Sequence, residues 1–418
     1  MQLTEFDHQS LIERTRRDFA PFYDQLRWIT PEAAEEMTRL RRELLDILSS
    51  NAATAFGNTK PFTGSLSPGC RLCGGEWSCL FINNICNARC FYCPSRQQQV
   101  DEPGTSTLTF VHAKDYVDYL EYFGFKGASI SGGEPFMTFE RTLAFASLIK
   151  KRFGERIYLW LYTNGILAAD DKLRRLRDAG LDEIRFNIGA VGYSLDRVSK
   201  AVGIIPHVTI EVPAVPERVD ELISLLPEMK ERGVDFLNLH QIRCTAFNYP
   251  NLVSRGYTFV HGPATGVAES EIAALTVLAH AAERGIGPAV NYCSLIYRQR
   301  YQARAARHRW AERLKKGHED ITETGMIRSL SCAADPSVLD GLETSFAAEG
   351  AGLYQRKNGR LYFGRALMAP VLAAGAGLRV SYYLPSIHPS VTYRNPYQEV
   401  RLNRKKTVVL ERASAVAD

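Results

Sequence analysis

The chain reads SCLFINNICNARCFYCP from residue 78 to residue 94. Its first five residues are mostly apolar and predict a strand, and three cysteines follow on a loop. Thiolates this close together can bind three irons of a [4Fe-4S] cube and leave the fourth iron without a protein ligand. The alternative is a zinc site, but zinc favours four closed ligands and paired Cys-x2-Cys spacing. We therefore expect Cys86, Cys90 and Cys93 to bind an iron-sulfur cluster.

Beyond this loop, short apolar runs alternate with amphipathic stretches of helical period. Strands are expected at 78–82, 128–131, 157–162, 183–188, 207–212 and 236–240, with helices at 113–122, 139–153, 170–179, 195–202 and 217–232. Six such repeats predict parallel strands with right-handed crossovers. The expected fold class is α/β: a partial (β/α)6 TIM-like barrel, an N-terminal helical segment and a small C-terminal α/β extension. Chemistry in such barrels lies at the C-terminal ends of the strands, where the cysteine loop falls.

The sequence divides into four expected regions. They are an N-terminal helical segment with a Cys-x2-Cys arm (1–76), the barrel (77–245), a loop and helical extension (246–330) and a small α/β domain (331–418). In the first region, two helices are expected between residues 9 and 56, the second with Thr30 as N-cap and Pro31 in its first turn. In the third, residues 247–265 predict a long lid or substrate loop, followed by helices at 269–284 and 295–316. In the tail, strands are expected at 360–363, 378–383 and 407–411, with a helix near 367–374.

Composition limits the protein class. The 418 residues are 45% hydrophobic, as in a globular protein with a sizeable core. We expect neither a signal peptide nor a membrane span. Nine cysteines without a signal favour metal or redox chemistry in a reducing cytosol, so a cytoplasmic location is expected. The net charge of +5 neither favours nor excludes a polyanionic partner, and nucleic acid stays possible without being favoured.

The spacing Cys-x3-Cys-aromatic-x-Cys resembles the signature of the radical SAM enzymes. The segment Gly132-Gly133-Glu134-Pro135 follows the second expected strand, as the family's Gly-Gly-Glu-Pro segment does. The resemblance covers residues 77 to about 243 and implies a [4Fe-4S] cluster, S-adenosylmethionine (SAM) and an electron donor such as flavodoxin or ferredoxin. The sequence around the motifs also resembles that of a poorly characterised group described as related to pyruvate formate-lyase activating enzymes.

The resemblance assigns residues to SAM. It places Phe91 or Tyr92 near the adenine, Thr163 and Asn164 at the ribose, Arg185 at the carboxylate, Glu211 near the adenine, and Gly132, Gly133 and Glu134 at the methionine amino group. Arg185 offers two parallel donors to a carboxylate, although a place at the solvated rim is the alternative. For Thr163 and Asn164 the alternative is turn chemistry before Gly165.

Four further cysteines form a second hypothesis. The Cys-x2-Cys spacing of Cys70 and Cys73 suits one metal ion, and Cys293 and Cys332 are the candidates to complete a four-cysteine site. Such a site would hold a second iron-sulfur cluster or a zinc ion. The alternative is that all four are ordinary thiols.

A basic run follows Cys293. Within it Arg300, Arg304 and Arg307 share one helical face and predict contact with an anionic group of a small-molecule substrate. An RNA backbone or a solvated face are the alternatives.

Two classes of function remain open. The first is a radical enzyme that cleaves SAM reductively and acts on an unidentified, anionic small molecule, or, less commonly, transfers the aminocarboxypropyl group of SAM. The second is an iron-sulfur binding or electron-transfer protein without radical catalysis. The Gly-Gly-Glu-Pro segment favours the enzyme, because an electron carrier needs no cradle for the SAM amino group.

Overall fold

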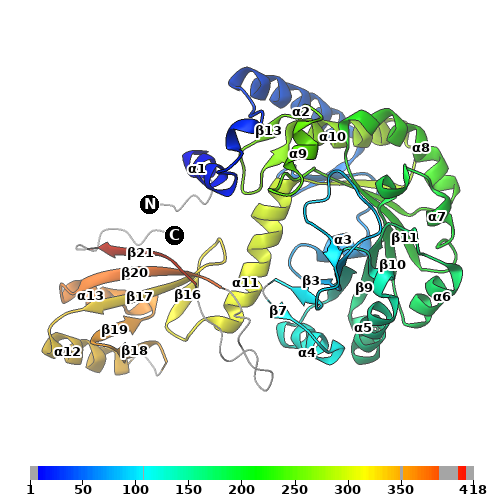
Figure 1. Cartoon of the computed structure of the whole chain (residues 1–418). Coiled ribbons are helices and arrows are strands. Elements are labelled where there is room, and N and C mark those ends of the chain that lie inside the picture. Colours follow the sequence, from blue (N-terminus) through cyan, green and yellow to red (C-terminus); the bar gives the residue numbers. More distant parts are fainter. Residues whose placement is uncertain (1–7, 107, 349–351, 386–402, 411–418) are drawn as a thin grey trace. The chain divides into compact units, whose positions relative to one another are not determined.

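The computed structural model describes residues 8–106, 108–348, 352–385 and 403–410. They divide into two compact units, a larger one of residues 5–105 and 109–302 and a smaller one made chiefly of residues 303–418 (Figure 1). Among the described residues, no helix combines the length and the apolar character needed to cross a membrane.

Seven parallel strands form the centre of the larger unit, in the order β15-β12-β11-β10-β9-β8-β3. They are β3 (Trp77–Phe81), β8 (Gly127–Ser131), β9 (Tyr158–Thr163), β10 (Glu183–Phe186), β11 (His207–Pro213), β12 (Phe236–His240) and β15 (Ala289–Cys293). The six predicted strands are confirmed. The seventh, β15, was not predicted, because we interpreted its cysteine as a metal ligand and not as part of a strand.

Short antiparallel strands lie at both edges of this sheet, which is therefore open and not a closed barrel. β2 (Lys60–Phe62) pairs with β15 and with β1 (Ala53–Ala55), and β6 (Gly104–Thr105) pairs with β3. Within β9, Leu159, Trp160 and Leu161 are all fully buried. Such continuous burial is typical of parallel strands covered on both faces.

Helices connect the successive parallel strands and cover the outer face of the sheet (Figure 1). They are α4 (Ala113–Phe123), α5 (Phe139–Phe153), α6 (Asp170–Asp178), α7 (Asp196–Ser199), α8 (Val219–Glu231) and α10 (Ala268–Arg284). The two expected N-terminal helices are α1 (His8–Asp18) and α2 (Pro31–Asn51), and α2 packs beside α10. The Thr30 side chain accepts a hydrogen bond from Ala33 N at 3.2 Å, which confirms the predicted N-cap.

A five-residue helix, α3 (Pro68–Leu72), lies inside the barrel. Ser67 caps it by accepting a hydrogen bond from Cys70 N at 3.1 Å, and Pro68 occupies its first turn. Gly69 is so tightly packed that an added Cβ would overlap the Arg185 guanidinium and lie 3.2 Å from Trp160. An added Cβ on Gly127, the first residue of β8, would lie 3.0 Å from Leu72, so α3 packs against the N-terminal part of the sheet.

Residues 247–265 do not form the long loop that their composition predicted. The segment contains α9 (Tyr249–Val253) and β13 (Phe259–Val260), and β13 pairs with β14 (Gly266–Val267). Its apolar residues, including Leu252 and Phe259, are buried in one cluster with Phe19 and Leu26. This packing against the N-terminal segment gives the region a core of its own.

The smaller unit has an antiparallel sheet in the order β18-β19-β17-β20-β21, with β16 also paired to β17. The strands are β16 (Glu319–Ile321), β17 (Ile327–Ala333), β18 (Tyr354–Lys357), β19 (Arg360–Phe363), β20 (Gly377–Leu384) and β21 (Asn403–Leu410), and the helices are α11 (Ala303–Leu314), α12 (Pro336–Ala347) and α13 (Met368–Ala373). Phe346, Leu361, Phe363 and Val371 are fully buried in its core. The predicted tail strands and helix are confirmed as β19, β20, β21 and α13, except that Glu411 lies outside the described residues.

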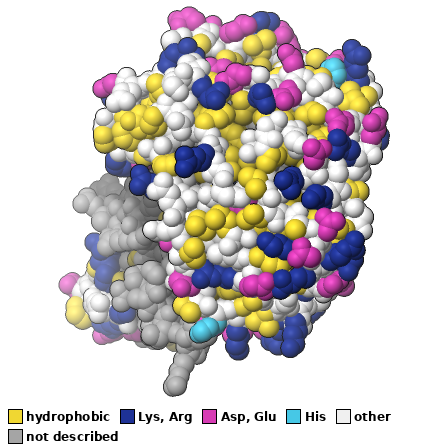
Figure 2. Space-filling model, turned by 45° about the vertical axis from the view of Figure 1, so that its right-hand side comes forward, with side chains coloured by type: hydrophobic (Ala, Val, Ile, Leu, Met, Phe, Trp, Pro, Cys, Tyr) yellow, Lys and Arg dark blue, Asp and Glu magenta, His cyan; other side chains and the backbone are white. Residues whose placement is uncertain are grey.

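Figure 2 shows one face of the molecule, on which Lys and Arg side chains lie among Asp and Glu side chains. Charges of both signs are therefore mixed over that face. A continuous basic stripe, the usual feature of a nucleic-acid surface, is not seen there.

We expect Gly69→Ala to lower the free energy of unfolding by about 1–3 kcal/mol, because the added methyl group overlaps the Arg185 guanidinium. Gly74→Ala is the matched control, since a Cβ at Gly74 meets nothing within 4 Å. Urea denaturation of both variants measures the difference. Equal stability of the two would contradict the packing of α3 inside the barrel.

Candidate active site

A cavity of about 560 Å³ opens at the C-terminal ends of the parallel strands. The cysteine loop after β3 and the turn after β8 line it, together with residues at or just beyond the ends of the other five strands, among them Asn164, Asn187, Pro213, His240 and Cys293. This is the end at which (β/α) barrels carry their catalytic groups. Of the 12 residues that we assigned from the sequence to the cluster and to SAM, ten line this cavity: Cys86, Cys90, Cys93, Tyr92, Gly132, Gly133, Thr163, Asn164, Arg185 and Glu211.

The cysteine loop contributes three thiols to this cavity. Cys86 follows β4 (Asn84–Ile85), which pairs with β5 (Gln98–Gln99), and the Cys93 amide donates to the Cys90 carbonyl at 3.0 Å. Burial raises the pKa of Cys86 and of Cys90. No three His, Cys, Asp or Glu side chains of the described residues are already close enough to share one ion, so small side-chain rotations would have to complete a metal site.

The turn after β8 is locked to the base of the cysteine loop. The Gly133 amide donates to Asn83 Oδ1 at 3.0 Å, and the Glu134 amide donates to the Ile85 carbonyl at 2.7 Å. An added Cβ on Gly133 would overlap that carbonyl, and Gly132 has φ +136, a conformation that favours glycine. Both glycines are therefore required for the close approach of the two loops.

The Glu134 carboxylate does not line the cavity. It is 1% exposed and accepts hydrogen bonds from Thr163 Oγ1 at 2.8 Å, Asn164 N at 2.7 Å and Phe136 N at 3.0 Å. Burial raises its pKa. Glu134 thus ties the end of β8 to the end of β9, and only its glycine neighbours present their backbone to the cavity.

Thr163 and Asn164 lie at the cavity wall, where their side chains also form a turn. The Gly165 amide donates to Thr163 Oγ1 and the Ile166 amide donates to Asn164 Oδ1, each at 3.0 Å. The Asn164 amide group contacts the cysteine loop, 2.7 Å from Asn87 Oδ1 and 3.7 Å from Cys86 Sγ. The structure therefore contains the turn chemistry that was the alternative to ribose binding.

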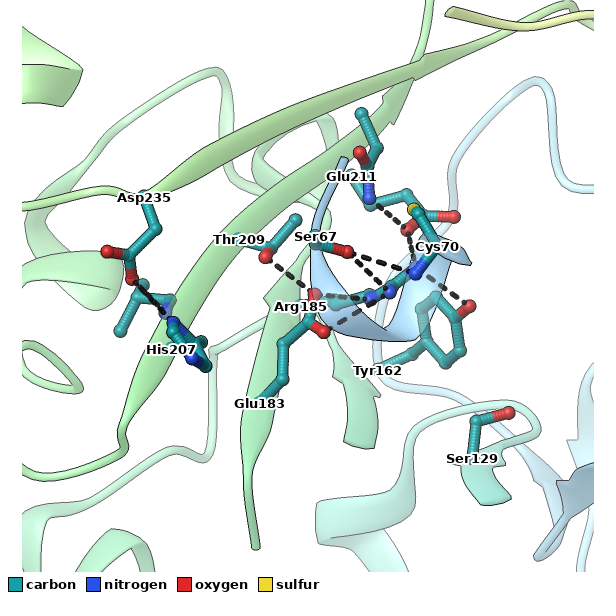
Figure 3. Close-up of polar contacts among 12 residues, drawn as sticks. Ser67, Cys70, Ser129, Tyr162, Glu183, Arg185, His207, Thr209, Glu211 and Asp235 are labelled. Carbon is teal, nitrogen blue, oxygen red and sulfur yellow. Dashed lines mark hydrogen bonds and ion pairs between the residues drawn. The ribbon is translucent and has the colours of Figure 1, made fainter. Parts of the chain in front are cut away.

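Arg185 is already fully paired inside the barrel (Figure 3). Its Nε donates to Glu183 Oε1 at 2.8 Å, and its Nη1 donates to Glu211 Oε2 at 2.8 Å. Its other hydrogen bonds go to Tyr162 Oη at 3.3 Å, Ser67 Oγ at 3.1 Å and Glu183 Oε2 at 3.3 Å. Burial opposes the charge, but Glu183, Cys70, Tyr162 and Glu211 together outweigh that effect and raise the pKa of Arg185.

This pairing corrects the expectation that Arg185 binds the SAM carboxylate, because the N–H groups of its guanidinium already donate to acceptors in the protein. Glu211 is committed as well, since it accepts from Arg185 and, at 3.2 Å, from Asn238 Nδ2. The charge of Arg185 lowers the pKa of Glu211 despite the burial of that carboxyl group. Both residues line the cavity, yet their first role is to hold the barrel together.

Residues 245–255 hold the outer part of the cysteine loop. Asn248 Nδ2 donates to the Tyr92 carbonyl at 3.0 Å, and Thr245 Oγ1 donates to the Pro94 carbonyl at 2.8 Å. The Arg255 guanidinium lies 3.7 Å from the centre of the Phe91 ring. Of the two aromatic residues assigned to the adenine, Tyr92 lines the cavity and Phe91 does not.

Three of the four other cysteines assigned to metal are brought together. Cys70, Cys73 and Cys293 line the same cavity. Cys332 does not join them: it lies in β17, fully buried among apolar side chains of the smaller unit. The four-cysteine prediction is therefore wrong in its fourth member, because the Ser-Cys-Ala context of Cys332 belongs to a core strand.

The predicted arginine stripe is also corrected. Residues Tyr297–Gln302 form a π-helix, whose wider turn changes the i, i+3 and i, i+4 spacing on which the stripe was based. Arg300 does not line the cavity, whereas Arg298 does. In the smaller unit, Arg304 pairs with Glu323 at 3.1 Å and Arg307 donates to the Thr324 carbonyl at 2.8 Å.

Of the basic residues that line the cavity, four were not predicted to do so: Lys60, His240, Arg243 and Arg298. His240 is the last residue of a predicted strand, and the rule that chemistry lies at the C-terminal ends of the strands would have found it. Lys60 carried no such signal, because β2 reaches the barrel only through its pairing with β15, about 230 residues later in the chain.

Comparison with known proteins identifies the larger unit. Residues 80–211 match the model of the radical SAM superfamily. These residues are a radical SAM domain. The match contains the cysteine loop, both glycines and the ends of β9 and β10, and it supports an enzyme that uses a [4Fe-4S] cluster and SAM.

Two curated proteins of Methanocaldococcus jannaschii are similar in sequence to this chain. A candidate glycyl-radical enzyme activating enzyme is 29% identical over 276 residues, which are 63% of this chain and 72% of the relative. A candidate GTP 3',8-cyclase is 28% identical over 162 residues, which are 36% of this chain and 52% of that protein. Among solved structures, methylornithine synthase superposes with a TM-score of 0.34 at 13% identity, over 65% of this chain and 84% of the other.

We expect His240 to make the metal-free protein sensitive to acid. Burial lowers the pKa of His240 from 6.5 to about 4, so the unfolded chain takes up a proton at a higher pH than the folded protein does. Stability should fall by about 2–3 kcal/mol as the pH drops from about 6.5 to about 4.

His240→Gln should remove this part of the pH dependence, whereas His112→Gln, at an exposed position, should leave it. Urea denaturation at several pH values in the presence of a chelator measures the effect. An unchanged pH profile in His240→Gln would show that another group titrates.

Proposed function

We propose that Cys86, Cys90 and Cys93 bind the SAM-cleaving [4Fe-4S] cluster of this protein. The observation that carries the proposal is that the three thiols and the backbone of Gly132 and Gly133 line one cavity at the C-terminal ends of the strands. The thiols suit a [4Fe-4S] cluster. They have the Cys-x3-Cys-x2-Cys spacing, they share one loop, and the Asn164 amide group lies 3.7 Å from Cys86 Sγ. When bound, such a cluster supplies the electron that breaks a carbon–sulfur bond of SAM.

The residues around the thiols would position SAM. The Gly132 and Gly133 backbone would accept the methionine amino group, because no side chain stands between it and the cavity. The Tyr92 ring offers an apolar face for the adenine, and its hydroxyl is fixed by a 2.9 Å bond to Asn187 Oδ1. Glu134 would act only as a positioning residue, and Arg185 and Glu211 would maintain the wall of the cavity.

The size of the cavity favours a small-molecule substrate. At about 560 Å³ it lies in the range of small-ligand pockets, although it must also hold part of SAM. The relative named as a glycyl-radical enzyme activating enzyme suggests a second candidate, a peptide segment that enters the open end of the barrel. Aminocarboxypropyl transfer from SAM, and electron transfer without radical catalysis, are the remaining candidates.

We further propose a cytoplasmic location and reduction by a flavodoxin or ferredoxin. All nine cysteines are free thiols, as expected in a reducing compartment. An external electron donor is required because a cluster that reduces SAM must itself be reduced in each cycle.

Anaerobic reconstitution with iron and sulfide, followed by dithionite and SAM, is expected to yield deoxyadenosine. The variant with Cys86→Ala, Cys90→Ala and Cys93→Ala should lose the product, while Cys244→Ala, a thiol buried in an apolar cluster, should keep it. Liquid chromatography of the products makes the measurement. An aminocarboxypropyl product would select the transfer reaction, and no SAM-derived product from folded, cluster-loaded wild-type protein would overturn the enzymatic proposal.

The anionic group of the substrate would bind Arg243 and Arg298, in place of the predicted Arg300, Arg304 and Arg307. Both arginines line the cavity, and neither pairs with a carboxylate of the described residues. Burial and then the Arg298 charge lower the pKa of Arg243, so two like charges face the same space. An anion between them would relieve this repulsion.

Inorganic phosphate can serve as the probe for this anion site. At constant ionic strength it should raise the Tm of the wild-type protein, and Arg298→Gln should reduce that shift at least twofold. Arg300→Gln is the matched control, because Arg300 lies two residues away and outside the cavity. An equal phosphate shift in wild type and Arg298→Gln would show that the cavity does not bind anions through this residue.

A further inference from the structure

The cavity contains a second group of thiols that the proposed SAM chemistry does not use. Cys70 and Cys73 come from α3 and its C-terminal end, and Cys293 is the last residue of β15. Segments more than 200 residues apart in sequence thus bring three sulfurs to the wall of one cavity, where side-chain rotations would have to bring them onto one ion. Asn291 lies two residues before Cys293 on the same strand, and its Nδ2 is 3.8 Å from Cys70 Sγ.

A buried lysine accompanies these thiols. The Lys60 side chain is 1% exposed, and its Nζ lies 3.7 Å from Cys293 Sγ and 4.4 Å from the centre of the Tyr297 ring. No carboxylate of the described residues pairs with it. A buried ammonium group without a carboxylate is costly unless another anion neutralises it, and the sulfurs are the acceptors that lie beside it.

We propose that Cys70, Cys73 and Cys293 form a second metal site, which binds a thiophilic centre, either Zn²⁺ or an iron-sulfur cluster. Three thiolates with a centre of two positive charges leave one net negative charge, which the Lys60 ammonium group neutralises. The site therefore accounts at once for three thiols in one cavity and for a lysine buried without a carboxylate.

The arrangement differs from a closed structural zinc site. A closed site has four protein ligands, whereas here Cys332, the expected fourth, lies in the core of the smaller unit. All three thiols line the cavity, so the fourth position of the centre faces the space that the substrate would occupy. Such an open position suits coordination of a substrate heteroatom or of water.

The site also has the support expected around metal ligands. Asn291 Nδ2 lies 3.2 Å from Asn238 Oδ1 and reaches Cys70 Sγ, and Ser67 holds the first turn of α3 through Cys70 N. Arg185 fixes the same turn by contacting Ser67 Oγ. The thiols of α3 are therefore placed by a rigid set of bonds, while Cys293 is placed by the sheet.

The test uses full-length protein in which Cys86, Cys90 and Cys93 are replaced by Ala, so that the first site is absent. Elemental analysis after anaerobic reconstitution, once with zinc and once with iron and sulfide, should find about one equivalent of zinc or one cluster. Adding Cys73→Ala or Cys293→Ala should lower the metal affinity at least tenfold in competition with a chelator. Adding Cys244→Ala, a buried thiol outside the cavity, should leave it unchanged.

Two further readouts keep the result interpretable. Co²⁺ in place of zinc should give thiolate-to-metal charge-transfer absorption that weakens with each cysteine removed, and Lys60→Met should reduce affinity roughly tenfold by removing the balancing charge. Circular dichroism checks folding. A folded background variant that binds neither metal, or one whose binding is unaltered by Cys73→Ala and Cys293→Ala, overturns the proposal. Because the background lacks the first site, this outcome is independent of any failure of SAM cleavage.

Discussion

The fully paired guanidinium of Arg185 is the interaction on which the larger unit depends. It joins β10 to β11 through Glu211 and to the N-cap of α3 through Ser67. Removing only one member would leave buried charge without a partner, which costs far more than an exposed ion pair contributes. A helix of five residues has too little apolar surface to hold itself inside a barrel. The bond from Arg185 to Ser67 fixes α3 in place, and this offsets the cost of burying the charges.

The position of α3 determines what kind of space the barrel encloses. With α3 packed against the N-terminal part of the sheet, the open end is the approach to the cavity, and the thiols of α3 lie inside it. At the open end, Asn83 and Glu134 connect the cysteine loop, the glycine turn and the end of β9. Catalytic groups on loops need such support, because errors of about an ångström in their placement reduce rates strongly.

The sequence predicted those parts of the molecule that local pattern controls. Six strands, their helices and the cysteine loop follow from periodicity and spacing, and the Thr30 cap follows from residue type alone. β15 was missed because its five residues lie outside the regular repeat and contain a conspicuous cysteine. The role of Arg185 was misjudged for a different reason: its partner Glu211 lies 26 residues away, and only the strand register shows that their side chains meet.

The arginine stripe shows a second limit of local pattern. Equal spacing along the sequence indicates a shared face only while the helix keeps its α geometry, and the π-helix at Tyr297–Gln302 breaks that condition. The same irregularity leaves Arg298, and not Arg300, at the cavity. π-Helical turns are often found at functional sites, since they turn a side chain to a face that a regular helix would not offer.

Charge balance connects the two proposed metal sites with the substrate. Besides the paired Arg185, the cavity wall contains the cations Lys60, Arg243 and Arg298, and it contains the six thiols of the two proposed sites, which become anionic only when they bind metal. Lys60 lies beside the thiols of the second site, whereas Arg243 and Arg298 have no carboxylate partner among the described residues. With metal bound to both thiol groups, the two arginines would be the positive charges left for a substrate. An anionic group held there would leave the rest of the molecule facing SAM, as a reaction that must exclude water and act at one carbon requires.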